Sequence, residues 1–137
     1  MTKKIIKYSI LVIILVLIFI LGFFVYKNLF AGINNTWYEN IENYKLTNDE
    51  KNSIKDKVKE LEGIKSVDVY IDSKIIKIVV KLEKDIDFEA IKNKANESIE
   101  CFSKENLSYY DLEFFVDYVE QDNQIGYKFK TDSEFSW

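Results

Sequence analysis

The sequence predicts an α+β protein, in which an N-terminal transmembrane helix precedes a two-layer α-β-β-α-β-β sandwich with a mostly antiparallel sheet. Three observations predict this fold. Residues 8–26 carry no charge, two later segments repeat apolar residues at helical spacing, and four segments alternate apolar with polar residues. Helices packed on one face of a small sheet form a two-layer α+β domain.

These patterns divide the chain into five parts. We expect a cytoplasmic N-terminus (1–7), a transmembrane helix (8–27), a juxtamembrane linker (28–46), an α+β domain (47–131) and a loose C-terminal tail (132–137). The roughly 110 residues after the apolar run suffice for one small domain and not for two.

The apolar run "YSILVIILVLIFILGFFVY" predicts an uncleaved membrane anchor. At about 1.5 Å per residue, a helix of this length covers roughly 28 Å, close to the hydrocarbon thickness of a bilayer. A secretion signal usually has a shorter apolar core and a small-x-small cleavage site, whereas only Ala31-Gly32 is small here. A buried core helix would have a polar face, and this run has none. Later cleavage of the anchor stays an open alternative.

The distribution of lysine predicts the orientation. Lys3, Lys4 and Lys7 precede the run, and only Lys27 follows it closely. Positive charge favours the cytoplasmic side, so we expect a cell-membrane protein with its N-terminus in the cytoplasm and its domain extracytoplasmic.

The first half of the domain contains a predicted helix and a hairpin. Thr47 and Glu50 have capping-box spacing, which predicts a helix over 48–62, and Gly63 is placed to adopt the left-handed backbone that follows a helix. "IKSVDVYID" (64–72) and "IIKIVVKLE" (75–83) alternate and predict two strands around a short turn.

The second half predicts a helix and two further strands. Asp87 is a good N-cap for a helix within 85–102, and "KENLSYYD" is expected to be a loop. "LEFFVDYVE" (112–120) and "IGYKFKT" (125–131) alternate and predict the last two strands. In the final strand we expect Ile125, Tyr127 and Phe129 to face the core. Lys128 and Lys130 are expected outside, protecting a sheet edge.

Composition excludes several classes of function. The 19 basic residues are all Lys; four lie in residues 1–27, which leaves 15 against all 23 acidic residues and a net charge of −8 for the rest of the chain. Such a domain is unsuited to nucleic acid, which needs a basic surface. The chain has no His, Arg or Pro, so the commonest general base and metal ligand is absent. We expect no enzyme activity and no cofactor. The Lys, Ile and Asn content is typical of an AT-rich, Gram-positive-type genome.

Two candidate chemical sites have simpler interpretations. Cys101 is the only cysteine, lacks a His to activate it and cannot form an internal disulfide, so we interpret it as a bystander on a helix. The acidic segment "EKDIDFE" (83–89) offers carboxylates for Ca²⁺ but lacks the glycine and spacing of an EF-hand. Capping of the following helix explains it better.

A candidate interaction surface comes from the residues that alternate away from the core. If the helices cover the Val69, Ile78 and Phe114 face of the sheet, then Tyr70, Val79, Phe115 and Val119 lie on the opposite face. An apolar patch on a solvent-facing sheet often marks a partner or self-association surface. Alternatively, these residues are ordinary scattered apolar positions, or Trp37 in the linker or Trp137 in the tail covers them.

The run from "VKELEGIKSVDVYID" through "KLEKDIDFEAIKNKANESIE" to "LEFFVDYVE" resembles a group of small αββαβ modules. They are the ring-building motif of secretion and sporulation assemblies, the BON domain and the alkaline-shock protein family. The resemblance covers about 75 residues, carries over no site residue and implies non-catalytic work in assembly, scaffolding or envelope association. Alkaline-shock domains are cytoplasmic, whereas the lysine distribution here predicts a domain outside the membrane.

Two hypotheses about function follow. The first is a single-pass membrane protein whose extracytoplasmic domain mediates protein–protein interaction, self-association or assembly in the cell envelope. The second is a ligand-binding or envelope-sensing module for peptidoglycan, lipid or peptide, because "SYYDLEFF" and "GYKF" are rich in aromatic residues.

Overall fold

The computed structural model describes residues 2–31 and 41–137, with side chains described at 5, 6, 8–26 and 41–137. The chain forms two compact units, residues 1–39 and 40–137. Trp37, a predicted cover for the sheet, lies outside the described residues. The two units are described separately below.

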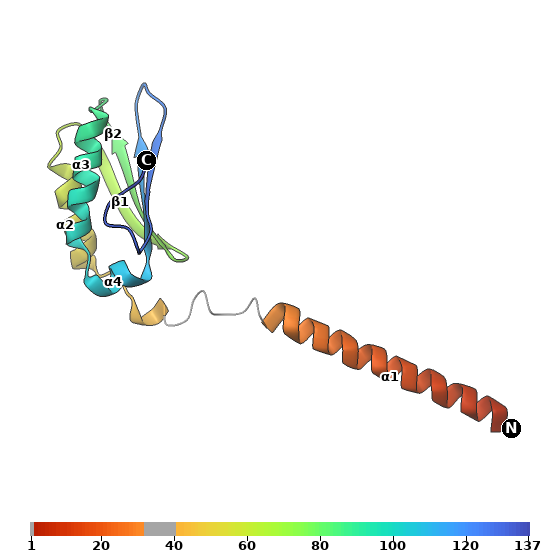
Figure 1. The fold of residues 1–137 in the computed structure, drawn as a ribbon. Coiled ribbons are helices and arrows are strands. Elements are labelled where there is room, and N and C mark those ends of the chain that lie inside the picture. Colours follow the sequence, from red (N-terminus) through yellow and green to blue (C-terminus); the bar gives the residue numbers. More distant parts are fainter. Residues whose placement is uncertain (1, 32–40) are drawn as a thin grey trace. The chain divides into compact units, whose positions relative to one another are not determined.

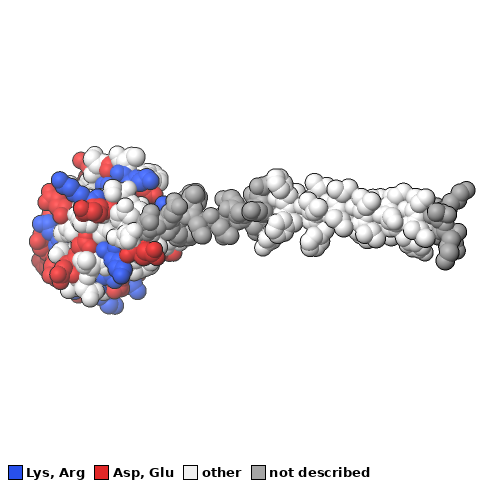
Figure 2. Space-filling view, turned by 90° about the horizontal axis from the view of Figure 1, so that it is seen from below, with Lys and Arg blue, Asp and Glu red and all other residues white. Residues whose placement is uncertain are grey.

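The first unit contains helix α1 (Thr2–Ala31), which is longer than the predicted span of 8–27. Within it, residues Tyr8–Tyr26 have a mean hydropathy of 3.1 and none of these residues is buried, so α1 is long and apolar enough to cross a membrane. An N-terminal secretion signal satisfies the same test of length and composition. The hydroxyl of Ser9 donates to the carbonyl of Ile5 (3.0 Å), so the helix satisfies this polar group itself. The described side chains of α1 are white in Figure 2, whereas blue basic and red acidic side chains are mixed over the face of the domain that is in view.

The second unit is an α+β domain with a four-stranded mixed sheet (Figure 1). Its helices are η1 (Ile41–Asn43), α2 (Asn48–Lys59), α3 (Phe88–Ser98), η2 (Ile99–Cys101) and α4 (Lys104–Tyr109). Its strands are β1 (Ile64–Asp72), β2 (Ile75–Leu82), β3 (Asp111–Asp117) and β4 (Gln124–Lys128). The predicted α+β class and the N-terminal apolar helix are confirmed.

Local signals determine where α2 and α3 begin. The Thr47 hydroxyl accepts from the Glu50 N–H (3.2 Å), and the Glu50 carboxylate accepts from the Thr47 N–H (3.0 Å), which completes the predicted capping box. The Asp87 carboxylate accepts from the Ala90 N–H (3.2 Å) at the start of α3. Helix α2 ends at Lys59, and Gly63 then turns the chain into β1 with a φ of +100°.

The strands are ordered β1-β2-β3-β4 across the sheet. β1 and β2 form the predicted antiparallel hairpin, and β3 pairs antiparallel with β4. The central pair, β2 and β3, is parallel, because the chain returns through α3 and α4 before it enters β3. The sheet is therefore mixed, with two antiparallel pairs and one parallel pair.

The inner face of the sheet packs against α2 and α3, which lie on the same side of it (Figure 1). Val69, Ile78 and Phe114 are buried there, as predicted, and Ile54 of α2 and Ile91 of α3 are at most 1% exposed. Each Å² of apolar surface removed from water contributes roughly 25 cal/mol to stability. This shared core is therefore the main source of the domain's stability.

The described end of the predicted linker, residues 41–46, and the predicted loop are both structured, whereas residues 32–40 of the linker lie outside the described residues. Residues 41–46 pack on the domain: Leu46 is buried, and the carbonyl of Tyr44 accepts from the hydroxyl of Tyr110 (2.6 Å). The ring of Tyr44 also stacks on Tyr109, with centroids 4.1 Å apart. The segment predicted as a loop before β3 contains α4, whose Ser103 cap accepts from the Asn106 N–H (3.2 Å).

The predicted faces of β4 are wrong. Ile125 and Tyr127 are about 40% exposed, whereas Gly126 and Lys128 face inward and Lys128 is only 4% exposed. Pairing fixes this register, because Phe114 lies opposite Gly126 and Phe115 lies opposite Ile125. The expectation that Lys128 points outward to protect the edge is therefore also wrong.

The tail is packed rather than loose. Ser136 pairs with Tyr127 through two backbone hydrogen bonds of 2.8 Å, which places the tail beside β4. Phe135 is buried, and the ring of Trp137 packs edge-to-face on Phe88 and Phe114. These two aromatic side chains complete the inner layer beneath β4.

Candidate interaction surface

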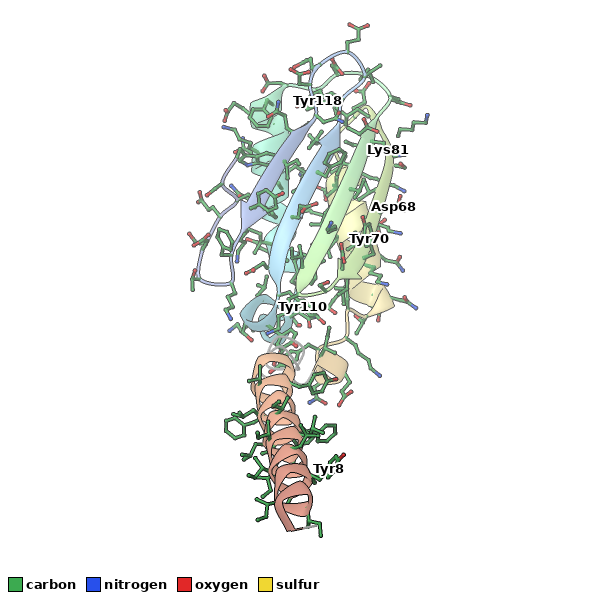
Figure 3. All side chains as sticks on the ribbon, turned by 90° about the vertical axis from the view of Figure 1, so that its right-hand side faces the viewer. Tyr8, Asp68, Tyr70, Lys81, Tyr110 and Tyr118 are labelled. Carbon is green, nitrogen blue, oxygen red and sulfur yellow. The ribbon has the colours of Figure 1, made fainter. Side chains whose placement is uncertain are left out.

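The side of the sheet turned away from α2 and α3 is the outer face, and Figure 3 views it directly. Strand register arranges its side chains in rows that cross the sheet. One row is Asp68, Val79, Phe115 and Ile125, and the next is Tyr70, Lys77, Glu113 and Tyr127. A shorter third row contains Ser66, Lys81 and Asp117.

Three of the four predicted surface residues lie together on the outer face. Val79 lies beside Phe115 in the centre, and both are half-buried. Tyr70 lies one row away on β1 and is 45% exposed. Val119 follows the end of β3 and is 55% exposed, and its N–H donates to the Asp85 carboxylate (2.9 Å). Val119 is therefore separate from the central rows.

Sequence reasoning missed the contribution of β4. Ile125 extends the central row to Phe115, and Tyr127 ends the next row, with both side chains exposed. Phe129, just beyond β4, is 58% exposed, so the expectation that it faces the core is also wrong. The sequence signal for this orientation of β4 was Gly126. An inward glycine leaves space that the aromatic residues of "EFSW" can fill, so its neighbours Ile125 and Tyr127 can point outward.

Charged side chains interrupt the apolar rows. The ammonium group of Lys77 lies 3.1 Å from the Asp72 carboxylate and 3.9 Å from that of Glu113. The hydrogen bond to Asp72, followed by the charge of Glu113, raises the pKa of Lys77 above its ordinary value. The outer face is thus amphipathic, with apolar and aromatic side chains among charges of both signs.

Cys101 lies on the helical side of the domain, away from the outer face. It is half-buried in η2, and its thiol contacts the carbonyl of Ser53 at 3.7 Å. Burial raises the pKa of the thiol, which lowers the thiolate fraction at neutral pH. A half-buried thiol with a raised pKa is consistent with the prediction that Cys101 is a bystander on a helix.

Two carboxylates of the acidic segment before α3 accept backbone hydrogen bonds, and one of them caps the helix as predicted. Asp87 caps α3, and Asp85 accepts from the backbone N–H groups of Val119 (2.9 Å) and Glu120 (3.4 Å). Among the described residues, no group of three or more His, Cys, Asp or Glu side chains is arranged to hold a metal ion.

No protein-family model matches the sequence, and comparisons with curated proteins and with solved structures found no match. The resemblance to ring-building, BON and alkaline-shock modules therefore stays a prediction.

Proposed function

We propose that this chain is a single-pass membrane protein whose extracytoplasmic domain is a non-catalytic interaction or assembly module of the cell envelope. The outer face carries this proposal. In a two-layer arrangement the helices use only the inner face, and the outer face exposes Tyr70, Ile125 and Tyr127 around half-buried Val79 and Phe115. Aromatic side chains are enriched at protein interfaces relative to the rest of the surface, and the exposed tyrosines of the outer face fit that enrichment.

The anchor and its orientation are supported by composition. The 19 residues Tyr8–Tyr26 match the hydrocarbon thickness of a bilayer, and three of the four nearby Lys precede them. The absence of His from the sequence supports non-catalytic work, because the side chain most used for proton transfer at neutral pH is missing.

Crosslinking tests the interaction role. A photoreactive amino acid at Tyr127 of the full chain, in its native membrane, should give a specific crosslinked product. The matched control is the same group at Asn52, which is exposed on α2. Products of equal yield at both positions, or none at Tyr127, would refute an interaction surface at the outer face.

Cysteine labelling tests the orientation. Because Cys101 is half-buried and burial raises the pKa of its thiol, the reporter should be Gln121→Cys in the exposed β3–β4 connection, combined with Cys101→Ser. A membrane-impermeant maleimide should label this variant in intact cells as fully as after lysis. Labelling that requires lysis would place the domain in the cytoplasm and contradict the proposed topology.

A further inference from the structure

The charges of the outer face are sorted by strand. β2 presents Lys77 and Lys81 there, and β3 presents Glu113 and Asp117. In the parallel register, Lys77 lies beside Glu113 and Lys81 lies beside Asp117. Val79 and Phe115 lie between these two charged rows (Figure 3 labels Lys81). On the outer face, the three successive side chains of β2 are therefore basic, apolar and basic. Those of β3 are acidic, apolar and acidic.

We infer that a second copy of this chain packs on the outer face, about a two-fold axis that runs parallel to β2 and β3 and between them. Such an axis places β2 of each copy over β3 of the other. Lys77 then faces Glu113 of the second copy, and Lys81 faces Asp117 of the second copy. Val79 faces Phe115 of the second copy, and Tyr70 faces Tyr127.

Aligned packing of two sheets is compatible with this pairing. Stacked sheets lie about 10 Å apart with strand directions within about 30° of each other. Because the contact extends over only three rows, β2 of each copy stays over β3 of the other along its whole length. Each charged side chain that β2 and β3 present in these rows meets one of opposite sign, and Val79 and Phe115 are enclosed between them. Asp68 of β1, at the end of the central row, faces Ile125 of the second copy at the rim of the pair.

The other two-fold arrangement of the same faces is unfavourable. An axis perpendicular to the strands, in the plane of the interface, reverses the order of the rows. It places Lys77 against Lys81 and Glu113 against Asp117 of the second copy. Like charges brought together at an interface lose their hydration without gaining a partner. The charge pattern therefore selects parallel strands in the pair.

This inference rests on the proposed membrane anchor, because the interface is small. Four strands at about 4.8 Å spacing and five residues at about 3.3 Å give roughly 320 Å² per copy. The total of about 640 Å² is below the roughly 1,200 Å² of standard stable interfaces. Parallel strands put residue 41 of both copies at the same end of the pair, and anchoring both copies in one membrane raises their effective concentration.

A charge-reversal experiment tests the pairing. The variant Lys77→Glu/Lys81→Glu/Glu113→Lys/Asp117→Lys keeps the net charge and re-forms the pairs between β2 and β3 with opposite sign. It should associate with itself, as the wild type does. Mixed pairs of variant and wild type should be at least tenfold fewer, because β2 of one would face like charges on β3 of the other.

The measurement is resonance energy transfer between full-length chains in liposomes, labelled at Gln121→Cys in a Cys101→Ser background. Unlabelled wild-type chain should compete with wild-type transfer, and the unlabelled variant should not. The matched control swaps an exposed pair away from the outer face, Glu62→Lys/Lys84→Glu, whose partners lie 2.8 Å apart. It should compete like the wild type. Near-UV circular dichroism verifies that each variant is folded.

Each contrary outcome has a distinct meaning. Free mixing of variant and wild type, or mixing in preference to self-association, would overturn the parallel two-fold pairing. Absence of transfer in the wild type would overturn self-association. If Tyr127 then still crosslinks to a different protein in the native membrane, the proposed interaction function stands with another partner. If it crosslinks to nothing, the proposed function also fails.

Discussion

Tyr118 is a buried tyrosine whose hydroxyl contacts no hydrogen-bond partner among the residues that the structure describes. It follows β3 on the inner face and is 7% exposed. Burial, followed by the nearby charges of Asp85 and Asp87, raises the pKa of this hydroxyl. An unpaired buried polar group costs roughly 1–3 kcal/mol. The ring is therefore useful to the core while the hydroxyl weakens it.

We expect Tyr118→Phe to raise the free energy of unfolding by about 1 kcal/mol, because it removes the unpaired hydroxyl and keeps the ring. Urea unfolding of the purified chain, followed by far-UV circular dichroism, measures this change. The control is Tyr110→Phe, which removes a hydroxyl that donates to the Tyr44 carbonyl (2.6 Å) and should destabilise by about 1 kcal/mol. Destabilisation by Tyr118→Phe would show that its hydroxyl has a partner.

Gly126 and Trp137 are matched in size. A Cβ atom at Gly126 would lie 2.8–2.9 Å from three atoms of the Trp137 ring. Gly126→Ala should therefore displace the indole from Phe88 and Phe114 and destabilise the domain by roughly 1–3 kcal/mol. Indole fluorescence should shift to the red. In a Trp137→Ala background, the same substitution should cost little, and an equal cost in both backgrounds would refute the contact.

At the scale of elements, Glu50 joins the start of α2 to the start of α4. Its carboxylate accepts from the Thr47 N–H (3.0 Å), the Ser103 N–H (2.9 Å) and the Asn106 side-chain amide (3.0 Å). Burial alone would raise the pKa of Glu50, but these hydrogen bonds outweigh it and hold the pKa below 4.5. One side chain thus completes a capping box and fixes a second helix.

We expect Glu50→Gln to destabilise the domain by about 2 kcal/mol at neutral pH, because it weakens the cap and the bonds to Ser103 and Asn106. Because the folded-state pKa of Glu50 is lowered, its contribution is complete above pH 4.5 and is lost as pH falls through the folded value. The stability difference between wild type and variant should therefore shrink below pH 4.5. Chemical unfolding of both proteins at several pH values, within about 3–6, provides the test. A stability difference that does not change with pH over this range would contradict the stabilising role of the Glu50 carboxylate.

Local signals predicted some elements well and could not predict others. The bounds of β1, the Thr47–Glu50 cap and the Asp87 cap were predictable, because each depends on residues a few positions apart. The parallel pairing of β2 with β3 depends on how α3 and α4 return the chain, which alternation alone does not encode. Helix α4 has only six residues, too short for a clear helical pattern.

Strand alternation predicts one part of the candidate surface and fails for the part that β4 contributes. Tyr70, Val79 and Phe115 were placed correctly because their strands alternate cleanly. Ile125 and Tyr127 were assigned to the core because apolar residues usually point inward. The inward positions of β4 instead hold Gly126 and Lys128, and side chains from residues 135 and 137 supply the missing apolar volume. Such a long-range substitution leaves no periodic signal in the strand itself.

At the scale of the whole domain, the tail closes the core. The Phe135 N–H donates to the Asn96 side chain of α3 (3.0 Å), and its ring packs against Phe114 of β3. The pairing of Ser136 with Tyr127 also satisfies part of the backbone edge of β4. Residues 135–137 thus connect α3, β3 and β4.

We expect Phe135→Ala to destabilise the domain by roughly 3–5 kcal/mol, as for other buried Phe residues, against a total of about 5–15 kcal/mol for small domains. Thermal unfolding by near-UV circular dichroism measures the loss. Glu134→Ala, at an exposed neighbouring position, is the matched control and should change stability by less than about 0.5 kcal/mol. Equal midpoints for the two variants would mean that the tail does not contribute to the core.

Closure of the core by residues 135–137 also constrains biosynthesis. Translation adds about 5–20 residues per second from the N-terminus, so α2 and the β1–β2 hairpin are made several seconds before Phe135 and Trp137. From the synthesis of β3 until residues 135–137 emerge, the apolar inner side of β3 lacks its final cover. Packing of the core can therefore be completed only after residues 135–137 have emerged from the ribosome.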